Sequence, residues 1–165
     1  MASRKGTISA KELQQQLQAN PEYQKMMREK EIQNQLIADE CAKDEEELVK
    51  AINQQGIHIE SVWDLVNNIE HPFLENNFTG PYEKVYPILI EHLDKPHHKR
   101  IRDGIIRALS EKGAKELAKD KLLEHFNTEQ DRSLKWVLAN ALNIVLSRGE
   151  RKKHPQIDLV LKRLV

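Results

Sequence analysis

Apolar residues recur every three or four positions along most of this chain, which is the spacing of one face of an α-helix. Charged residues interrupt every apolar run. Residues that start and stop helices stand between these segments. Ser9 with Glu12 and Ser61 with Asp64 each have the spacing of a capping box, and Gly56 is suited to a left-handed helix end. The pattern predicts an all-α fold.

The first segment predicts two helices with few apolar residues. One runs from the Ser9 cap to about Ala19, and a longer one runs from Pro21 to about Lys43, with glutamine and charge at most positions. A helix with so sparse an apolar face is marginal alone and needs a partner surface. Residues 1–43 are therefore expected to form an arm. The arm packs along the rest of the chain, pairs with a second copy as a coiled coil, or stays partly disordered.

The next segment predicts two helices and a long loop. The helices lie within residues 44–69 and are separated by Gly56. A helix-turn-helix that binds DNA is disfavoured, because the second of these helices is acidic and contains no lysine or arginine. The loop, residues 70–81, is expected to pack on the core through Phe73 and Phe78. It is also a candidate binding loop, since loops on a rigid scaffold often carry function.

The second half of the chain repeats itself with a period of 33 residues. Residues 89–109 align without a gap on residues 122–142, and the identical positions include His92 with His125. A fixed period of this length is typical of helical-repeat arrays. Each unit is expected to be a hairpin of two helices, followed by a closing helix near the C-terminus. Pro87 either kinks or starts the first helix of the first unit.

The first unit resembles the short bacterial form of HEAT-like repeats that is related to phycobilisome lyases. The resemblance covers about residues 82–165 and rests on Leu93, Asp94, Pro96, Arg102, Ala108 and Leu109. The second unit departs from the pattern because its turn has no proline and because Asn127 and Lys135 replace the aspartate and the arginine.

The resemblance implies a short right-handed α-solenoid of HEAT-like hairpins with extra N-terminal helices. We therefore expect an arm over residues 1–43 and a repeat domain over residues 44–165. The resemblance also implies that Asp94 and Arg102 form a ladder between neighbouring units. In function, it implies a cytoplasmic bacterial regulator, adaptor or immunity-type inhibitor.

Composition excludes several functions. The 26 lysines and arginines balance 26 aspartates and glutamates, so no global field attracts nucleic acid or an anionic membrane. No stretch approaches the roughly 20 apolar residues of a membrane span, and no secretory leader precedes the first helix. We therefore expect a cytoplasmic protein that does not contact membranes. The single cysteine, Cys41, is expected to be a small apolar filler of a helix rather than a reactive thiol.

The chain contains no glycine-rich phosphate loop, no Gly-x-Ser-x-Gly and no His-Glu-x-x-His. His97 and His98 are adjacent at a helix start and point apart, so they do not predict a metal site. We expect no catalysis, no cofactor and no metal. We expect instead a protein-binding module that uses the solvent-facing positions of stacked hairpins. The expected contact residues are Trp63, Phe73, Phe78, His92, Arg107 and His125.

Two basic clusters favour an alternative partner. Residues 95–102 and 148–153 both lie near turns, and on a common face they could meet a nucleic-acid backbone or an acidic protein. The residues concerned are Lys95, Lys99, Arg100, Arg102, Arg148, Arg151, Lys152 and Lys153. Nearby carboxylates, among them Asp94 and Asp103, can neutralise the first cluster instead.

Overall fold

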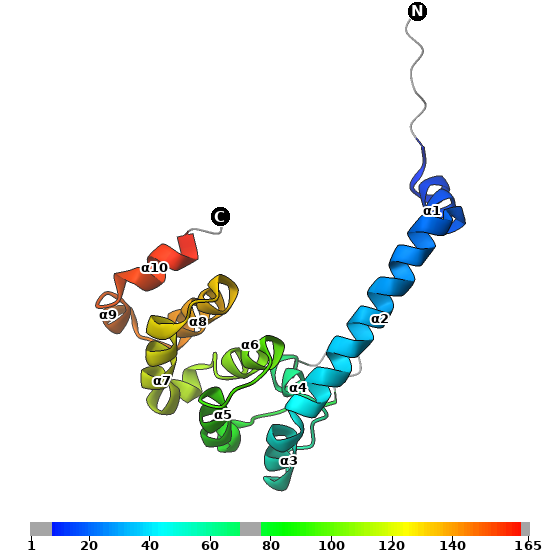
Figure 1. Cartoon of the computed structure of the whole chain (residues 1–165). Coiled ribbons are helices and arrows are strands. Elements are labelled where there is room, and N and C mark those ends of the chain that lie inside the picture. The colour runs from blue at the N-terminus through cyan, green and yellow to red at the C-terminus, as the bar shows by residue number, and fades with distance from the viewer. Residues whose placement is uncertain (1–7, 70–76, 163–165) are drawn as a thin grey trace, which may run out of the picture. The chain divides into compact units, whose positions relative to one another are not determined.

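The computed structural model describes residues 8–69 and 77–162 of the 165-residue chain (Figure 1). Every regular element in these two ranges is helical, with ten α-helices and two short 3-10 helices. The predicted all-α class is confirmed. The chain divides into two compact units, Met1–Glu40 and Cys41–Val165.

The first unit contains α1 and most of α2. α1 (Ala10–Ala19) begins at a capping box in which Ser9 Oγ accepts the Glu12 amide at 3.3 Å and Glu12 Oε2 accepts the Ser9 amide at 2.9 Å. α2 (Pro21–Asp44) follows directly, because Asn20 Oδ1 accepts two backbone N–H groups of its first turn. Both helix starts agree with the sequence prediction.

The second unit consists of consecutive helix pairs and a C-terminal helix. Its α-helices are α3 (Glu46–Gln54), α4 (Val62–Val66), α5 (Tyr86–Leu93), α6 (Lys99–Ala108), α7 (Lys115–Thr128), α8 (Arg132–Val145), α9 (Arg148–Arg151) and α10 (Pro155–Lys162). Two 3-10 helices, η1 (Glu83–Val85) and η2 (Lys112–Ala114), precede α5 and α7. α5 packs against both α3 and α7, α6 packs against both α4 and α8, and α10 packs on α8.

Several helix boundaries differ from the prediction for local reasons. α2 continues through Asp44, one residue beyond the predicted end at Lys43, and the carboxylate of Asp44 bonds to the turn between α5 and α6. Pro87 lies in the first turn of α5, where a missing N–H costs nothing, so it starts this helix and does not kink it. The expected turn after Ser147 is the short helix α9, which Ser147 and Glu150 cap reciprocally.

The core of the second unit follows the predicted apolar faces. The most regular apolar face is that of α8, and six of its residues are buried: Leu134, Val137, Leu138, Ala141, Leu142 and Val145. α4 and α6 approach most closely at Gly104, where an added Cβ would lie 2.6 Å from Val62 Cγ1 and 3.2 Å from Trp63 Nε1. In the part of the chain that is described, no helix combines the length and the apolar character needed to cross a membrane.

Candidate functional site

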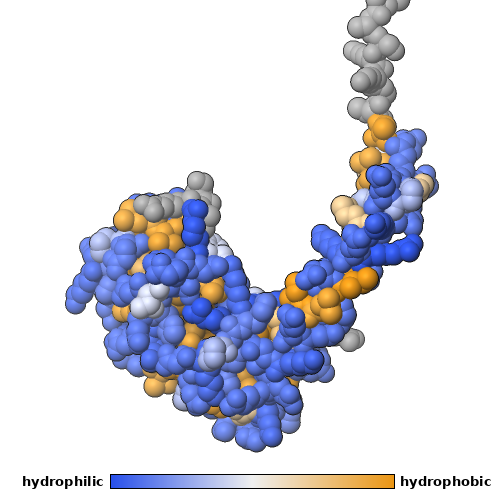
Figure 2. All heavy atoms as spheres, viewed as in Figure 1, coloured by the Kyte–Doolittle hydropathy of each residue, from blue (hydrophilic) through white to orange (hydrophobic). Residues whose placement is uncertain are grey.

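Large apolar side chains are exposed along α1 and α2, where hydrophobic side chains appear in orange in Figure 2. Residues 8–69 and 77–162 contain eleven exposed large hydrophobic residues, and seven of these lie in the first unit. We call these seven the arm surface: Ile8, Leu13, Leu17, Met26, Met27, Ile32 and Leu36. α1 has no buried residue, and the single buried residue of α2 is Cys41, which lies at the start of the second unit.

The arm surface has the chemistry of a contact surface. α2 has 24 residues, which corresponds to a length of about 36 Å. Most of the stability of a protein helix comes from packing its apolar face, and an exposed apolar cluster marks an interaction site. Two pairs of the arm surface, Leu13 with Leu17 and Ile32 with Leu36, lie one turn apart on their helices and so share a face.

A row of hydrogen bonds links the α2–α3 junction to the turn between α5 and α6. His97 Nδ1 lies 3.0 Å from Asp44 Oδ2, and His97 Nε2 lies 3.0 Å from His92 Nδ1. His92 Nε2 in turn lies 3.2 Å from Lys95 Nζ. The two imidazole rings are stacked, with centroids 5.2 Å apart. We call these four residues the histidine chain.

The histidine chain is buried in the middle and charged at both ends. His92 is 2% exposed, and the side chain of His97 is 5% exposed. Lys95 Nζ also lies 3.0 Å from a carboxylate oxygen of Glu47 and 3.0 Å from one of Glu91. Burial lowers the pKa of His92, and the positive charge of Lys95 lowers it further. His92 therefore favours its neutral form in the folded protein.

The same turn is fixed by a second set of contacts with the end of α2. The backbone N–H of His98 donates to Asp44 Oδ2 at 2.9 Å. His98 Nδ1 accepts the N–H of Arg100 at 3.2 Å, which caps α6, and it lies 3.3 Å from the sulfur of Cys41. Cys41 is 6% exposed, so its thiol is enclosed at this junction.

Ion pairs connect the α5–α6 hairpin to the α7–α8 hairpin. Asp94 accepts from Lys121 Nζ at 2.8 Å and from His125 Nε2 at 2.9 Å, and these two hydrogen bonds lower the pKa of its carboxyl group. Arg102 lies 2.9 Å from Glu129 in the next turn. Asp94 and Arg102 thus each form ion pairs with the following hairpin, Asp94 with Lys121 and His125 and Arg102 with Glu129.

Glu45 is a buried carboxylate that sequence reasoning missed. It is 5% exposed and accepts the backbone N–H of Val62 at 2.9 Å and the hydroxyl of Ser61 at 3.1 Å. It therefore caps the start of α4 from the start of α3. Burial raises the pKa of this carboxyl group. The acidic run 44–47 gives no local sign of which of its carboxylates is buried.

The predicted aromatic contact residues have different surroundings. Trp63 is partly buried against Gly104, and its Nε1 is buried without a hydrogen-bond partner among the described residues. Phe78 is partly buried and meets the Tyr82 ring edge-on, with centroids 6.4 Å apart. Phe73 lies outside the described residues. The two aromatic rings that are described therefore contribute packing as well as surface.

The other three predicted contact residues are engaged internally. His92 is enclosed in the histidine chain, so it presents almost no surface to a partner. The side chain of His125 is 17% exposed and bonds to Asp94. Arg107 is exposed on α6 and pairs with Asp103 at 2.6 Å. Of the three, Arg107 is the one placed to contact another molecule.

Half of the predicted basic residues are neutralised by carboxylates. In the cluster 95–102, carboxylates within 3.0 Å pair with Lys95, Lys99 and Arg102, while Arg100 forms no ion pair within the described ranges. In the cluster 148–153, Arg151 bonds to Asn143 and lies 3.6 Å from Asp158. The residues of this second cluster without an ion pair, as far as the described chain shows, are Arg148, Lys152 and Lys153.

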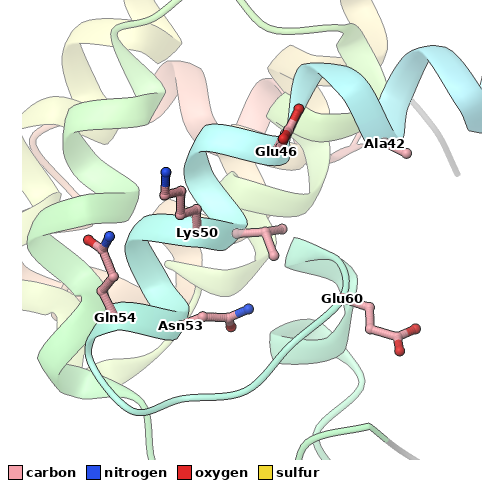
Figure 3. Close-up of a pocket in the computed structure, with 7 residues that line it drawn as sticks. Ala42, Glu46, Lys50, Asn53, Gln54 and Glu60 are labelled. Carbon is pink, nitrogen blue, oxygen red and sulfur yellow. The ribbon is translucent and has the colours of Figure 1, made fainter.

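An open groove of about 660 Å³ runs along α3 (Figure 3). Its lining comes from the end of α2, from α3 and from the loop after α3, and consists of Ala42, Glu46, Val49, Lys50, Asn53, Gln54 and Glu60. The side-chain amide of Asn53 is already hydrogen-bonded within the chain. Its Nδ2 donates to the Ile59 carbonyl, and its Oδ1 accepts the Ile59 N–H. No group of three or more metal-ligating side chains gathers anywhere in residues 8–69 and 77–162. Five of the seven lining residues carry a charged or amide side chain, whereas pockets that bind small molecules are lined mainly by hydrophobic and aromatic side chains.

The chain matches no protein-family model, no curated protein and no solved structure.

Proposed function

We propose that this chain is a non-enzymatic protein-binding module that uses the arm surface as its main contact. The observation that carries the proposal is the concentration of exposed apolar residues in the first unit, seven of the eleven found in the described chain. The proposed partner is a protein with an apolar groove that receives one face of a helix, a common mode of peptide recognition. Leu13 with Leu17 and Ile32 with Leu36 supply the paired anchors for such a groove.

We further propose that the hairpins of the second unit form a short right-handed α-solenoid of the HEAT-like kind, with α1 and α2 as extra N-terminal helices. Three observations support this: the 33-residue period, the packing of α5 between α3 and α7, and the ion pairs that join successive hairpins. In this proposal the array is a rigid scaffold, and Arg107 on α6 is a secondary contact. The HEAT-like resemblance adds a role as a cytoplasmic bacterial regulator or immunity-type inhibitor.

We place nucleic-acid binding second. Its support is that Arg148, Lys152 and Lys153 are exposed and form no ion pair within the described residues. Against it, Lys95, Lys99 and Arg102 are held by carboxylates of the chain itself, and the net charge is zero. Phosphate contacts would have to break these pairs, so little affinity is expected at physiological salt.

The test compares three forms of the full chain in affinity capture from the native host, followed by titration of the purified captured protein. The forms are wild type, the double variant Ile32→Glu with Leu36→Glu, and the control Leu117→Glu. Leu117 is 55% exposed on α7, so the control places one glutamate on an exposed apolar residue outside the arm. Ile32 and Leu36 are exposed in the free chain and would be buried in the proposed complex. Their replacement should therefore weaken binding by at least roughly tenfold in the double variant and not in the control.

Circular dichroism of all three forms establishes that the helices are retained. The proposal fails if the double variant binds the purified protein as tightly as wild type does. It also fails if the only captured species is nucleic acid that elutes early in a salt gradient, which would select the second candidate.

A further inference from the structure

We propose that the histidine chain Asp44–His97–His92–Lys95 is an acid-sensitive contact that holds the α2–α3 junction to the turn between α5 and α6. All four residues belong to the second unit. This inference is independent of the proposed binding function, because it concerns how the second unit holds itself together.

The two ends of the histidine chain permit one arrangement of protons. An ammonium group only donates, so His92 Nε2 must accept from Lys95. A neutral imidazole has one N–H, so His92 carries it on Nδ1 and donates it to His97 Nε2. His97 then carries its own proton on Nδ1 and donates it to Asp44, whose carboxylate only accepts. Every bond in the row is satisfied when both histidines are neutral.

One added proton breaks this arrangement at whichever histidine receives it. A proton on His97 Nε2 faces the N–H of His92 across 3.0 Å. A proton on His92 Nε2 faces the Lys95 ammonium across 3.2 Å. Either proton turns a hydrogen bond into a contact between two donors. Because both histidine side chains are almost fully buried, an N–H group that loses its acceptor there is largely shielded from water and costs free energy.

The charges around the histidine chain act in both directions. Glu47 of α3 and Glu91 of α5 favour a charged His92, while burial, Lys95 and His97 oppose it, and the outcome is a lowered pKa for His92. A histidine whose pKa is lower in the folded than in the unfolded state stabilises the fold above its unfolded pKa, near 6.5. That contribution is lost as the pH falls from about 6.5 towards the folded pKa.

Protons have a direct route to the histidine chain. An open recess of about 570 Å³ is lined by three of its members, Asp44, Lys95 and His97. The other charged groups on this recess are Lys43, Glu46, Glu47 and Lys50. Towards α6 and α2, the junction also contains His98 and Cys41. His98 Nδ1 accepts the capping N–H of α6, so a proton at that atom removes the cap and weakens the same junction.

The first test determines which ring nitrogen of each histidine carries the proton. In the full chain labelled with ¹⁵N-histidine, long-range ¹H–¹⁵N spectra at pH 7.5 should show His92 and His97 as Nδ1–H tautomers and His98 as the Nε2–H tautomer. An Nε2–H form of His92 or of His97 at this pH would contradict the required proton order and overturn the proposal.

The second test measures opening by hydrogen exchange, corrected for the intrinsic effect of pH on amide exchange. Between pH 7.5 and 5.5, amides in segments 41–47 and 95–98 should lose protection by roughly tenfold. Amides of α8 should keep their protection over the same range. Equal changes in all these segments would mean general acid unfolding and would overturn the proposal.

Two variants separate the histidine chain from other titrating groups. His92→Gln keeps an amide donor and a carbonyl acceptor at the same position and cannot be protonated, so it should reduce the local loss of protection in acid to the part that His97 and His98 contribute. His125→Gln is the matched control, because it changes the equivalent histidine of the next repeat unit. If His92→Gln opens in acid as wild type does, the proposal fails. If that variant does not fold, the proposal is tested by the tautomers of the wild-type protein, where an Nε2–H form of His92 or His97 contradicts it.

Discussion

At the scale of single residues, Glu45 makes the most testable contribution to stability. Glu45→Ala removes the acceptor of the buried Val62 N–H, and an unpaired buried donor costs about 1–3 kcal/mol. Glu45→Gln keeps a carbonyl acceptor and removes a charge that burial disfavours. At pH 7 we expect the alanine variant to be less stable than wild type and the glutamine variant to be at least as stable, measured by denaturant unfolding.

The pH dependence of Glu45 gives the control. Because the pKa of its carboxyl group is raised in the folded state, the cost of its charge appears only above the unfolded pKa of about 4.5. The difference between wild type and Glu45→Gln should therefore shrink as the pH is lowered from 7 towards 4. Equal destabilisation by both substitutions would show that the carboxylate itself, rather than an acceptor at this place, is required.

Single residues also show where the repeat misleads. His92 and His125 are equivalent by sequence, so the sequence predicted similar surroundings for both. His92 is buried because His97 stacks on it, whereas the repeat has Gln130 at the position equivalent to His97, and His125 bonds instead to Asp94. The repeat period predicts the position of a residue on its hairpin, whereas the neighbouring side chains determine whether that residue is buried and what it contacts.

At the scale of helices, Gly104 sets the approach of α4 to α6. An added methyl group would lie 2.6 Å from Val62 Cγ1, so Gly104→Ala should lower the free energy of unfolding by about 1–3 kcal/mol through overpacking. Gly149→Ala is the matched control, because nothing lies within 4 Å of its added Cβ. In the helix α9 this control should be neutral or should gain about 0.5–1 kcal/mol.

Denaturant unfolding followed by circular dichroism compares the two glycine variants. A Gly104→Ala protein as stable as wild type would mean that α4 moves away from α6 without cost. Tryptophan fluorescence adds a second readout, since Trp63, one of the two tryptophans of the chain, lies directly against Gly104.

Helices whose limits depend on nearby residues were predictable from the sequence. The start of α1 rests on the Ser9–Glu12 box, and the buried face of α8 rests on its apolar period. The end of α2 was predicted to within one residue, but the role of Asp44 was not, because Asp44 is fixed by His97 and by the backbone of His98, more than 50 residues further along the chain. The arm surface lies on predicted helices, but its exposure depends on packing, which the sequence left open among three alternatives.

At the scale of the whole molecule, the two units differ in how their helices are stabilised. Helices of the second unit pack on one another, whereas α1 and the first 20 residues of α2 bury no side chain in the described chain. Segments with few buried contacts open locally at low free energy. Limited trypsin digestion should therefore cut first at exposed sites such as Lys25, Arg28 and Lys30, and leave the second unit intact. First cuts within α6, α7 or α8, identified by mass spectrometry, would contradict this expectation.

The exposed apolar residues of α2 then suggest a prediction for how long the chain survives in a cell. The segment that a protease reaches most easily is also the segment that the proposed partner covers. Under the proposed function, a partner bound to the arm shields it from proteases and a chain without a partner is cut there, so the abundance of the full chain should follow the abundance of its partner. A trimmed chain would keep its folded repeat region and lose the means to bind.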